Sequence, residues 1–179
     1  RGNGVVAAAQ QVALIPQVSG SIVSTDPRLM PGGRFEKGEV IAQIDARDYR
    51  AMRDQAASGA QRAELELALE RGRADVAARE WEMVNADGTS PTDLALRKPQ
   101  LALAEQSVVA ARGALTRADL NVQRTRLRAP FNAVVVSENI DVGQVVAPGS
   151  VAVNLVGTDQ LWVTVSLSIS SVDVLQFSE

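Results

Sequence analysis

Two segments of similar sequence lie far apart in this chain of 179 residues. Residues 15–45 read IPQVSGSIVSTDPRLMPGGRFEKGEVIAQID, and residues 127–150 read LRAPFNAVVVSENIDVGQVVAPGS. Both contain proline, a run of β-branched residues, and glycines around a further valine, which is typical of short strands joined by tight turns. Neither segment alone offers enough strands to bury an apolar side. We therefore expect the two segments to close on one another as halves of one small β module.

The sequence between these segments is of a helical type. Alanine, glutamate and arginine dominate residues 46–84, where proline is absent. Small or apolar residues recur there every seven positions, with Glu70 as the polar break, in two lines: Tyr49, Ala56, Ala63, Ala77 and Val84, and Ala60, Leu67, Ala74 and Trp81. The same period continues later in the chain at Leu94, Leu101, Val108, Leu115 and Val122. A sustained seven-residue period with alanine in the seam predicts two closely packed helices of a coiled coil.

The segment NADGTSPTD, residues 85–93, separates the two helical arms. Gly88 suits a left-handed residue at a helix end, and Ser90, Pro91 and Asp93 are typical of a helix start, with serine as the N-cap. We expect an antiparallel hairpin with its tip at about residues 85–92 and arms of roughly 50 Å. Pro99 falls inside the second arm, and because the seven-residue period stays in phase across it, we expect a kink there rather than a boundary.

The composition argues against several classes of function. The chain has no histidine and no cysteine, so it lacks the usual zinc ligands and the base of a catalytic triad. Its net charge of −3 speaks against a nucleic-acid partner. The paired carboxylates Asp45 with Asp48 and Asp87 with Asp93 are better explained by a strand–helix junction and by turn and cap positions. We expect no enzyme activity, no cofactor and no metal site, and no apolar run is long enough to span a membrane.

Four stretches carry a resemblance to a known family. They are PQVSGSI at residues 16–22, FEKGEVIAQIDARDY at 35–49, TRLRAPFNAVV at 125–135 and VGQVVAPGS at 142–150. In this order they resemble periplasmic adaptor (membrane fusion) proteins of the HlyD type. The resemblance implies an α+β fold: a split lipoyl/biotinyl-like β-sandwich with an inserted antiparallel coiled-coil hairpin, plus the start of a β-barrel domain. Ala133 departs from the family, which usually has glycine there, and residues 20–33 form a longer stretch than usual.

The resemblance also implies a division of the chain. We expect residues 15–45 and 127–158 to be the halves of the lipoyl-like domain, with the hairpin at residues 46–126. Residues 1–14 and 159–179 are expected to belong to the β-barrel. In residues 159–179, polar and apolar residues alternate from Leu161 to Ile169, which predicts a strand. A short helix is expected to begin after it, near Ser170 or Ser171. Because the barrel cannot close within this sequence, we expect the chain to be part of a longer protein.

The function implied by the resemblance is mechanical. Such an adaptor links an inner-membrane efflux transporter to a TolC-type outer-membrane channel, and its copies associate into a ring or sheath. The expected location is the periplasm, with an anchor in the inner membrane. Tips that engage the channel carry arginine, leucine and serine at a spacing that Arg79, Met83 and Ser90 reproduce, with methionine in place of leucine. Each residue also has an ordinary explanation, as an exposed helix residue, a residue beside the helix seam and an N-cap.

Other functions fit less well. Within the adaptor class, the transporter could be of the ABC type or a type I secretion exporter, although hairpin length and tip pattern favour a resistance-nodulation-division (RND) pump for multidrug efflux. A biotin or lipoate carrier domain is the alternative from another class. It requires a lysine on the turn between the β halves, but the hairpin replaces this turn, and its one lysine, Lys98, lies on the second helical arm beside Pro99.

Overall fold

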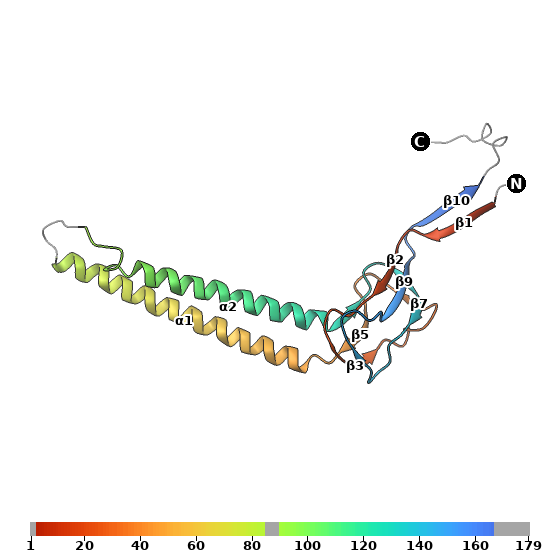
Figure 1. Cartoon of the computed structure of the whole chain (residues 1–179), viewed down its shortest axis with the longest axis horizontal. Helices are drawn as coiled ribbons and strands as arrows, with labels where there is room; N and C mark the ends of the chain where they lie inside the picture. Colours follow the sequence, from red (N-terminus) through yellow and green to blue (C-terminus); the bar gives the residue numbers. More distant parts are fainter. Residues whose placement is uncertain (1–2, 85–89, 167–179) are drawn as a thin grey trace, which may run out of the picture. The chain divides into compact units, whose positions relative to one another are not determined.

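The computed structural model of this chain describes residues 3–84 and 90–166. It divides into two compact units, one made of residues 1–45 and 124–179 and the other of residues 46–123 (Figure 1). The described residues of the first, here called the β unit, form the strands β1 (Asn3–Ala8), β2 (Gln11–Leu14), β3 (Gly20–Thr25), β4 (Arg34–Phe35), β5 (Val40–Ile44), β6 (Arg126–Arg128), β7 (Ala133–Glu138), β8 (Val145–Val146), β9 (Val153–Gly157) and β10 (Leu161–Ser166). The second, the hairpin, contains α1 (Arg47–Val84) and α2 (Lys98–Arg124).

Two four-stranded antiparallel sheets form the body of the β unit. Their strand orders are β2-β9-β7-β4 and β6-β5-β3-β8. Each half of the repeat contributes its short middle strand to the other half's sheet, because β4 pairs with β7 and β8 pairs with β3. Neither sheet is therefore complete with one half of the sequence. The predicted closure of two halves into one sandwich, with a helical hairpin inserted between them, is confirmed.

The core of the β unit is aliphatic and comes from both halves. Alternation along the strands puts one set of side chains inside, as in β9, where every second residue is buried. The largest fully buried hydrophobic side chains are Ile22, Ile41, Ile44, Val135, Val153 and Leu155. Ala133, at the position where the family usually has glycine, is also buried and pairs with Phe35. Its methyl group is thus accommodated in the sheet.

The sequence repeat is also a repeat of turn conformation. Gly38 lies between β4 and β5 with φ 89°, and Gly149 lies between β8 and β9 with φ 104°. This left-handed region strongly favours glycine over residues with a Cβ atom. Gly38 and Gly149 therefore reverse the chain at equivalent places in the two halves.

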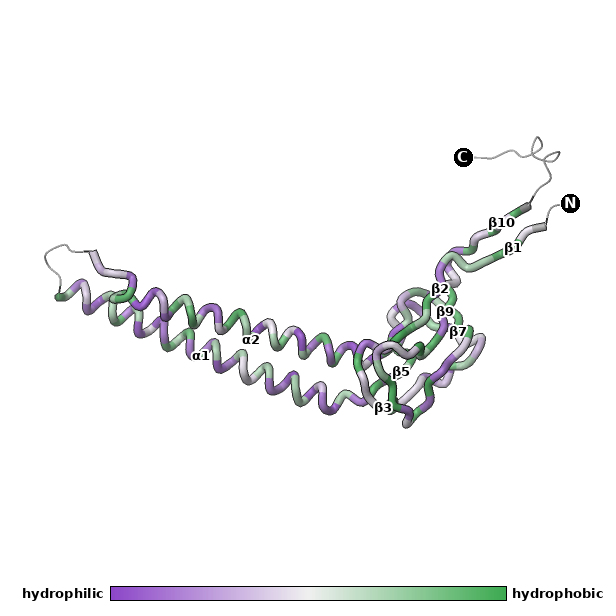
Figure 2. Tube along the Cα trace, in the orientation of Figure 1, coloured by the Kyte–Doolittle hydropathy of each residue, from purple (hydrophilic) through white to green (hydrophobic). Residues whose placement is uncertain are grey.

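The hairpin packs two long helices through small residues. Ala60, Ala63 and Val108 are buried between its helices, which confirms the seam predicted from the seven-residue period. Ion pairs across the helices join Arg112 to Glu64 at 2.7 Å, Arg71 to Glu105 at 3.4 Å and Arg53 to Asp119 at 3.1 Å. All three fit an antiparallel register. Figure 2 shows polar and apolar residues alternating along both helices, while the strands of the β unit are more continuously apolar.

Two helical glycines of the hairpin should be replaceable with a gain in stability. A Cβ atom added at Gly59 in α1 or at Gly113 in α2 would meet no heavy atom within 4 Å. Glycine inside a helix disfavours folding relative to alanine, so Gly59→Ala and Gly113→Ala should each raise the free energy of unfolding by up to about 1 kcal/mol. Thermal melting followed by circular dichroism at 222 nm measures this. The matched control, Gly38→Ala, should lower stability, and a loss on Gly59→Ala would contradict the open environment of that position.

The strands β1 and β10 form a separate two-stranded ribbon. They pair antiparallel from Asn3 opposite Ser166 to Ala8 opposite Leu161. The ribbon exposes apolar side chains at Val5, Val6, Leu161, Trp162, Val163 and Val165. The continuation to Ile169 and the expected helix near Ser170 or Ser171 lie outside the described residues. In the part of the chain that the structure describes, neither helix is apolar enough over its length to cross a membrane.

Candidate functional site at the distal end of the hairpin

The predicted contact residues lie around the end of α1 and before α2. Arg79 and Met83 are four residues apart near the C-terminal end of α1, so they share one face of the helix, and both are exposed. Met83 is 76% exposed and the adjacent Val84 is 80% exposed, so apolar surface is accessible at this end of α1. Ser90 is also exposed. Gly88 and the expected turn at residues 85–89 lie outside the described residues.

The start of the second helix differs from the prediction. A short helical turn precedes α2, and Thr92, not Ser90, caps it. The Thr92 Oγ1 accepts a hydrogen bond from the backbone N–H of Ala95 at 3.2 Å. This turn ends at Arg97, whose φ of 56° is left-handed. The N–H of Arg97 donates to the carbonyl of Leu94 at 3.1 Å, and that of Lys98 to Asp93 at 3.0 Å. These two bonds form a Schellman motif, the usual end of a helix.

The predicted kink at Pro99 is therefore wrong, since the chain breaks there and restarts. α2 begins at Lys98, and the carbonyl of Arg97 accepts the first new helical bond from Leu101 at 3.0 Å. The physical reason is that proline has no N–H to donate and its ring clashes with the preceding turn. In the first turn of α2 neither property is harmful, because the first N–H groups of a helix have no helical acceptor. The expected helix start at Ser90 and Pro91 is wrong for the same reason.

An ion pair between the buried Glu70 and the partly exposed Arg97 joins α1 to this break. Glu70 of α1 is only 8% exposed, and its Oε1 accepts from Arg97 Nε at 2.6 Å. Arg73 approaches the other carboxylate oxygen at 3.3 Å. The hydrogen bond from Arg97 is the main reason that the pKa of Glu70 is lowered, with help from Arg73 and against the effect of burial. The periodicity marked Glu70 as a polar break, and a carboxylate in a seam implies a cationic partner, but nothing local identified Arg97 as that partner.

The distal part of the hairpin also carries an open apolar groove. Its volume is about 640 Å³, and its lining includes Leu69, Gly72, Val76 and Ala77 of α1 together with Arg97. Leu69 and Val76 are more than half exposed. Apolar side chains in this arrangement can cover a neighbouring protein surface without any reacting group.

Both connections to the hairpin are joined inside the β unit. The N–H of Ile44 donates to the carbonyl of Thr125 at 2.7 Å. The Gln43 amide nitrogen donates to Ile44 O at 2.8 Å, to Thr125 Oγ1 at 3.0 Å and to Thr125 O at 3.3 Å. Thr125 is buried. The chain thus leaves and re-enters the β unit at adjacent points, as an inserted hairpin requires.

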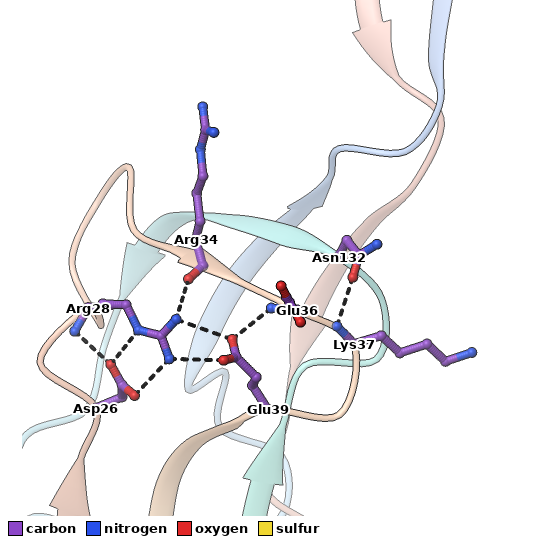
Figure 3. Close-up of polar contacts among 7 residues, drawn as sticks. All are labelled: Asp26, Arg28, Arg34, Glu36, Lys37, Glu39 and Asn132. Carbon is purple, nitrogen blue, oxygen red and sulfur yellow. Dashed lines mark hydrogen bonds and ion pairs between the residues drawn. The ribbon is translucent and has the colours of Figure 1, made fainter.

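A polar cluster orders the long stretch between β3 and β4 (Figure 3). Arg28 donates to both oxygens of Asp26, at 3.0 and 3.1 Å, and to both oxygens of Glu39, at 3.3 Å each. It also lies over the Phe35 ring, 4.8 Å from the centroid. The Arg28 hydrogen bonds lower the pKa of Asp26, and that of Glu39 is lowered first by the N–H of Glu36 and then by Arg28. Because two carboxylates already neutralise Arg28, this cluster fixes a loop rather than forming an anion site.

Asn132 links three turns near this cluster. Its Oδ1 accepts from the N–H of Lys37 at 2.9 Å, and its Nδ2 donates to Asp159 at 2.9 Å. Thr158 donates to the Asn132 carbonyl through its own N–H at 3.0 Å. No motif or period in the sequence predicted these bonds. Within residues 3–84 and 90–166, no three acidic side chains lie close enough to hold a metal ion.

Comparison with known proteins gives both a family and relatives. Residues 10–156 match the family model described as CzcB-like, barrel-sandwich hybrid domain. The multidrug resistance protein MdtA of Yersinia enterocolitica is 29% identical over 149 residues, which cover 83% of this chain. The matched region is 32% of MdtA, so the chain spans about a third of the length of this relative.

Solved structures with the same fold extend across nearly the whole chain. A protein assigned as an efflux transporter in Bacteroides eggerthii has a TM-score of 0.71 at 23% identity, covering 96% of this chain and 47% of its own. The membrane fusion protein Spr0693 of Streptococcus pneumoniae has a TM-score of 0.62 at 19% identity, with coverages of 97% and 70%. A chimera of MacA with the α-hairpin domain of Pseudomonas aeruginosa MexA has a TM-score of 0.57 at 22% identity, with coverages of 97% and 57%.

These structural likenesses describe the fold, while the sequence match identifies the family. The family model covers residues on both sides of the hairpin and most of the chain. The chain therefore belongs to the family described as CzcB-like, barrel-sandwich hybrid domain, which confirms the family resemblance found in its sequence.

Proposed function

We propose that this chain is the central part of a periplasmic adaptor that links an inner-membrane efflux transporter to a TolC-type outer-membrane channel. The observation that carries the proposal is the long hairpin inserted into a single β unit. α1 alone has 38 residues, which corresponds to roughly 57 Å of helix. Such a rod can span a distance and present a contact surface, but it brings no reacting groups together. A spacer that connects two partners is the function that this geometry supports best.

The contact with the channel is proposed at Arg79, Met83 and Ser90. The Arg79 guanidinium can donate to a carboxylate or a carbonyl, and the exposed Met83 can fill a small apolar hole. The Ser90 hydroxyl can hydrogen-bond across the contact, and Thr92 rather than Ser90 serves as the cap, which leaves Ser90 available for that role. These roles require only surface exposure, which all three residues have.

The ribbon of β1 and β10 supports the proposed β-barrel domain. It joins residues 3–8 to residues 161–166, as expected if these two segments belong to one further domain, whereas β2 pairs with β9 in the sandwich. Its exposed apolar residues, Val5 and Trp162 among them, would be covered by the remaining strands of such a barrel. The proposed limits of the two lipoyl-like halves are residues 15–45 and 127–158, with the hairpin at residues 46–126; β2, which was expected in the barrel, is added to the first half as an edge strand.

Assembly and location follow from the same proposal. A two-helix rod cannot cover both of its faces, so we infer that neighbouring copies pack into a ring or sheath, with the groove beside Leu69 and Val76 available for contact. The protein would reside in the periplasm with an anchor in the inner membrane. Likeness to a multidrug resistance protein supports a role in efflux. The hairpin length and the tip pattern favour an RND-type pump over the alternative of an ABC-type or type I secretion exporter. The genes that neighbour this one would separate these transporter classes.

Charge reversal at the tip tests the proposal. In the full-length adaptor, Arg79→Glu is expected to reduce drug resistance and recovery of the channel in cross-linking by about tenfold or more, because a repelling charge replaces a donor at the contact. The control is Arg62→Glu, a charge reversal at another exposed position of α1, nearer its N-terminal end. It should leave resistance unchanged. Full resistance of the Arg79→Glu strain at normal adaptor levels would rule out the proposed tip contact.

A further inference from the structure

The segment before α2 contains two competing helix starts. Ser90, Pro91 and Asp93 are typical of a start near residue 91, whereas the helix begins at Lys98. Leu94 shows the consequence. It is the first residue of the line that continues through Val108, but it is 68% exposed while Val108 is buried. The seven-residue period thus predicts Leu94 in the seam, whereas the break at Arg97 leaves its side chain exposed to solvent.

The register of the hairpin shows where Leu94 would lie in a longer helix. The ion pairs of Glu64 with Arg112 and Arg71 with Glu105 are separated by seven residues on both helices. Continuing the same antiparallel register, a helical residue 94 falls at the level of Trp81. Trp81 is half-buried and belongs to one of the two seam lines of α1. A continuous α2 would therefore add one more layer to the seam.

The bent state contains a conformational strain and a contact that compensates for it. Arg97 adopts the left-handed conformation, where glycine is usual, and an L-residue with a side chain is disfavoured there by about tenfold or more. Its guanidinium donates to the buried Glu70 at 2.6 Å. Without Arg97, the remaining partner of the Glu70 carboxylate among the described residues would be Arg73, at 3.3 Å. The ion pair and the left-handed residue thus depend on one another.

We propose that residues 91–98 are a two-state elbow: the pairing of Glu70 with Arg97 holds the bent state, and release of this pair lets residues 91–97 join α2 as one helix that packs Leu94 beside Trp81. Pro99 opposes the straight state by about a hundredfold, because it would then lie inside a helix. Relief of the left-handed residue and burial of Leu94 offset much of this. The bent state dominates in the native sequence, and few substitutions are needed to reverse the balance.

This equilibrium is a property of the chain itself and does not depend on the proposed function. If the proposed function also holds, the elbow would set where Ser90 is presented relative to Arg79 and Met83. A partner that binds the three residues together would then select one of the two states. The tip contact and the elbow can each be tested without the other.

The test compares three variants of the 179-residue chain. Glu70→Leu removes the acceptor and continues the apolar seam, Pro99→Ala removes the obstacle to a continuous helix, and the third variant combines both. The matched control is Arg73→Ala, which removes the exposed second partner of Glu70 but not Arg97. Backbone chemical shifts and HN–Hα couplings of residues 91–98, measured by NMR, report the state of Arg97 directly. Trp81 emission, measured in a Trp162→Phe background, reports whether Leu94 covers it.

The expected result is a stepwise change. The native chain and Arg73→Ala keep a left-handed Arg97. The double variant shows continuous helical shifts from residue 92 into α2 and blue-shifted Trp81 emission, a population change of about a hundredfold or more. Arg97→Ala removes the same pair from its other side and should act in the same direction, even if Glu70→Leu disturbs the seam. A left-handed residue 97 in both the double variant and Arg97→Ala, or an equal effect of Arg73→Ala, would overturn the proposal.

Discussion

Replacement of Leu155 by alanine is expected to lower the free energy of unfolding of the β unit by about 3 kcal/mol. Leu155 has no exposed surface and lies in the central strand β9, opposite Val12 on one side and Val135 on the other. The substitution removes buried methyl groups and leaves a cavity that close-packed neighbours cannot fill. Urea unfolding followed by the NMR amide signals of β3, β5, β7 and β9 measures the effect separately from the helices.

The control for this prediction is Val136→Ala in the adjacent strand β7. Val136 is 49% exposed, so its loss should change stability by less than about 0.5 kcal/mol. The location of the response also matters. Since β3 and β5 come from the first half of the repeat, their amides should lose protection together with those of β9. Protection that persists in β3 and β5 after Leu155→Ala would mean that the halves fold separately, contrary to the shared core.

Features that repeat along the chain were predictable from the sequence. The seven-residue period through Leu101, Val108 and Leu115 identifies the seam of α2, because a helix returns the same face at that interval. The recurring glycines and β-branched runs identify two β halves, and an inserted helical segment requires their ends to meet. The hydrogen bond from Gln43 to Thr125 shows that these ends are adjacent in the structure. Family resemblance added the order of the parts and the proposed partners.

Features that depend on one pair of distant residues were not predictable. The break before Pro99 relies on a left-handed arginine, which no propensity would place there, and on Glu70, which lies 27 positions away in the sequence. The cluster of Arg28 with Asp26 and Glu39 likewise follows no period. The observed cap is Thr92 and not the expected Ser90, because the break at Arg97 leaves a short separate turn ahead of α2 and Thr92 caps that turn. Tertiary contacts overrode local signals at each of these places.

A variant in which a short glycine–serine linker replaces residues 46–123 is expected to fold into the same β unit. The hydrogen bond from Ile44 N to Thr125 O, 2.7 Å long, shows that the chain ends left by the excision are adjacent. The variant also closes a much shorter loop on folding, which should raise its free energy of unfolding by about 2 kcal/mol relative to the intact β unit. Urea unfolding and the dispersion of the NMR amide signals measure stability and fold.

The two halves without any connection provide the contrast. Residues 1–45 alone leave β4 without β7, and residues 124–179 alone leave β8 without β3. Each fragment would expose core side chains such as Ile22 or Leu155 and should show the narrow amide dispersion of an unfolded chain. Mixing the fragments should restore the dispersed spectrum, because every missing strand partner is then supplied. A folded spectrum from either fragment alone would show that a half is self-sufficient, and the exchange of strands between the sheets would then not be what holds the module together.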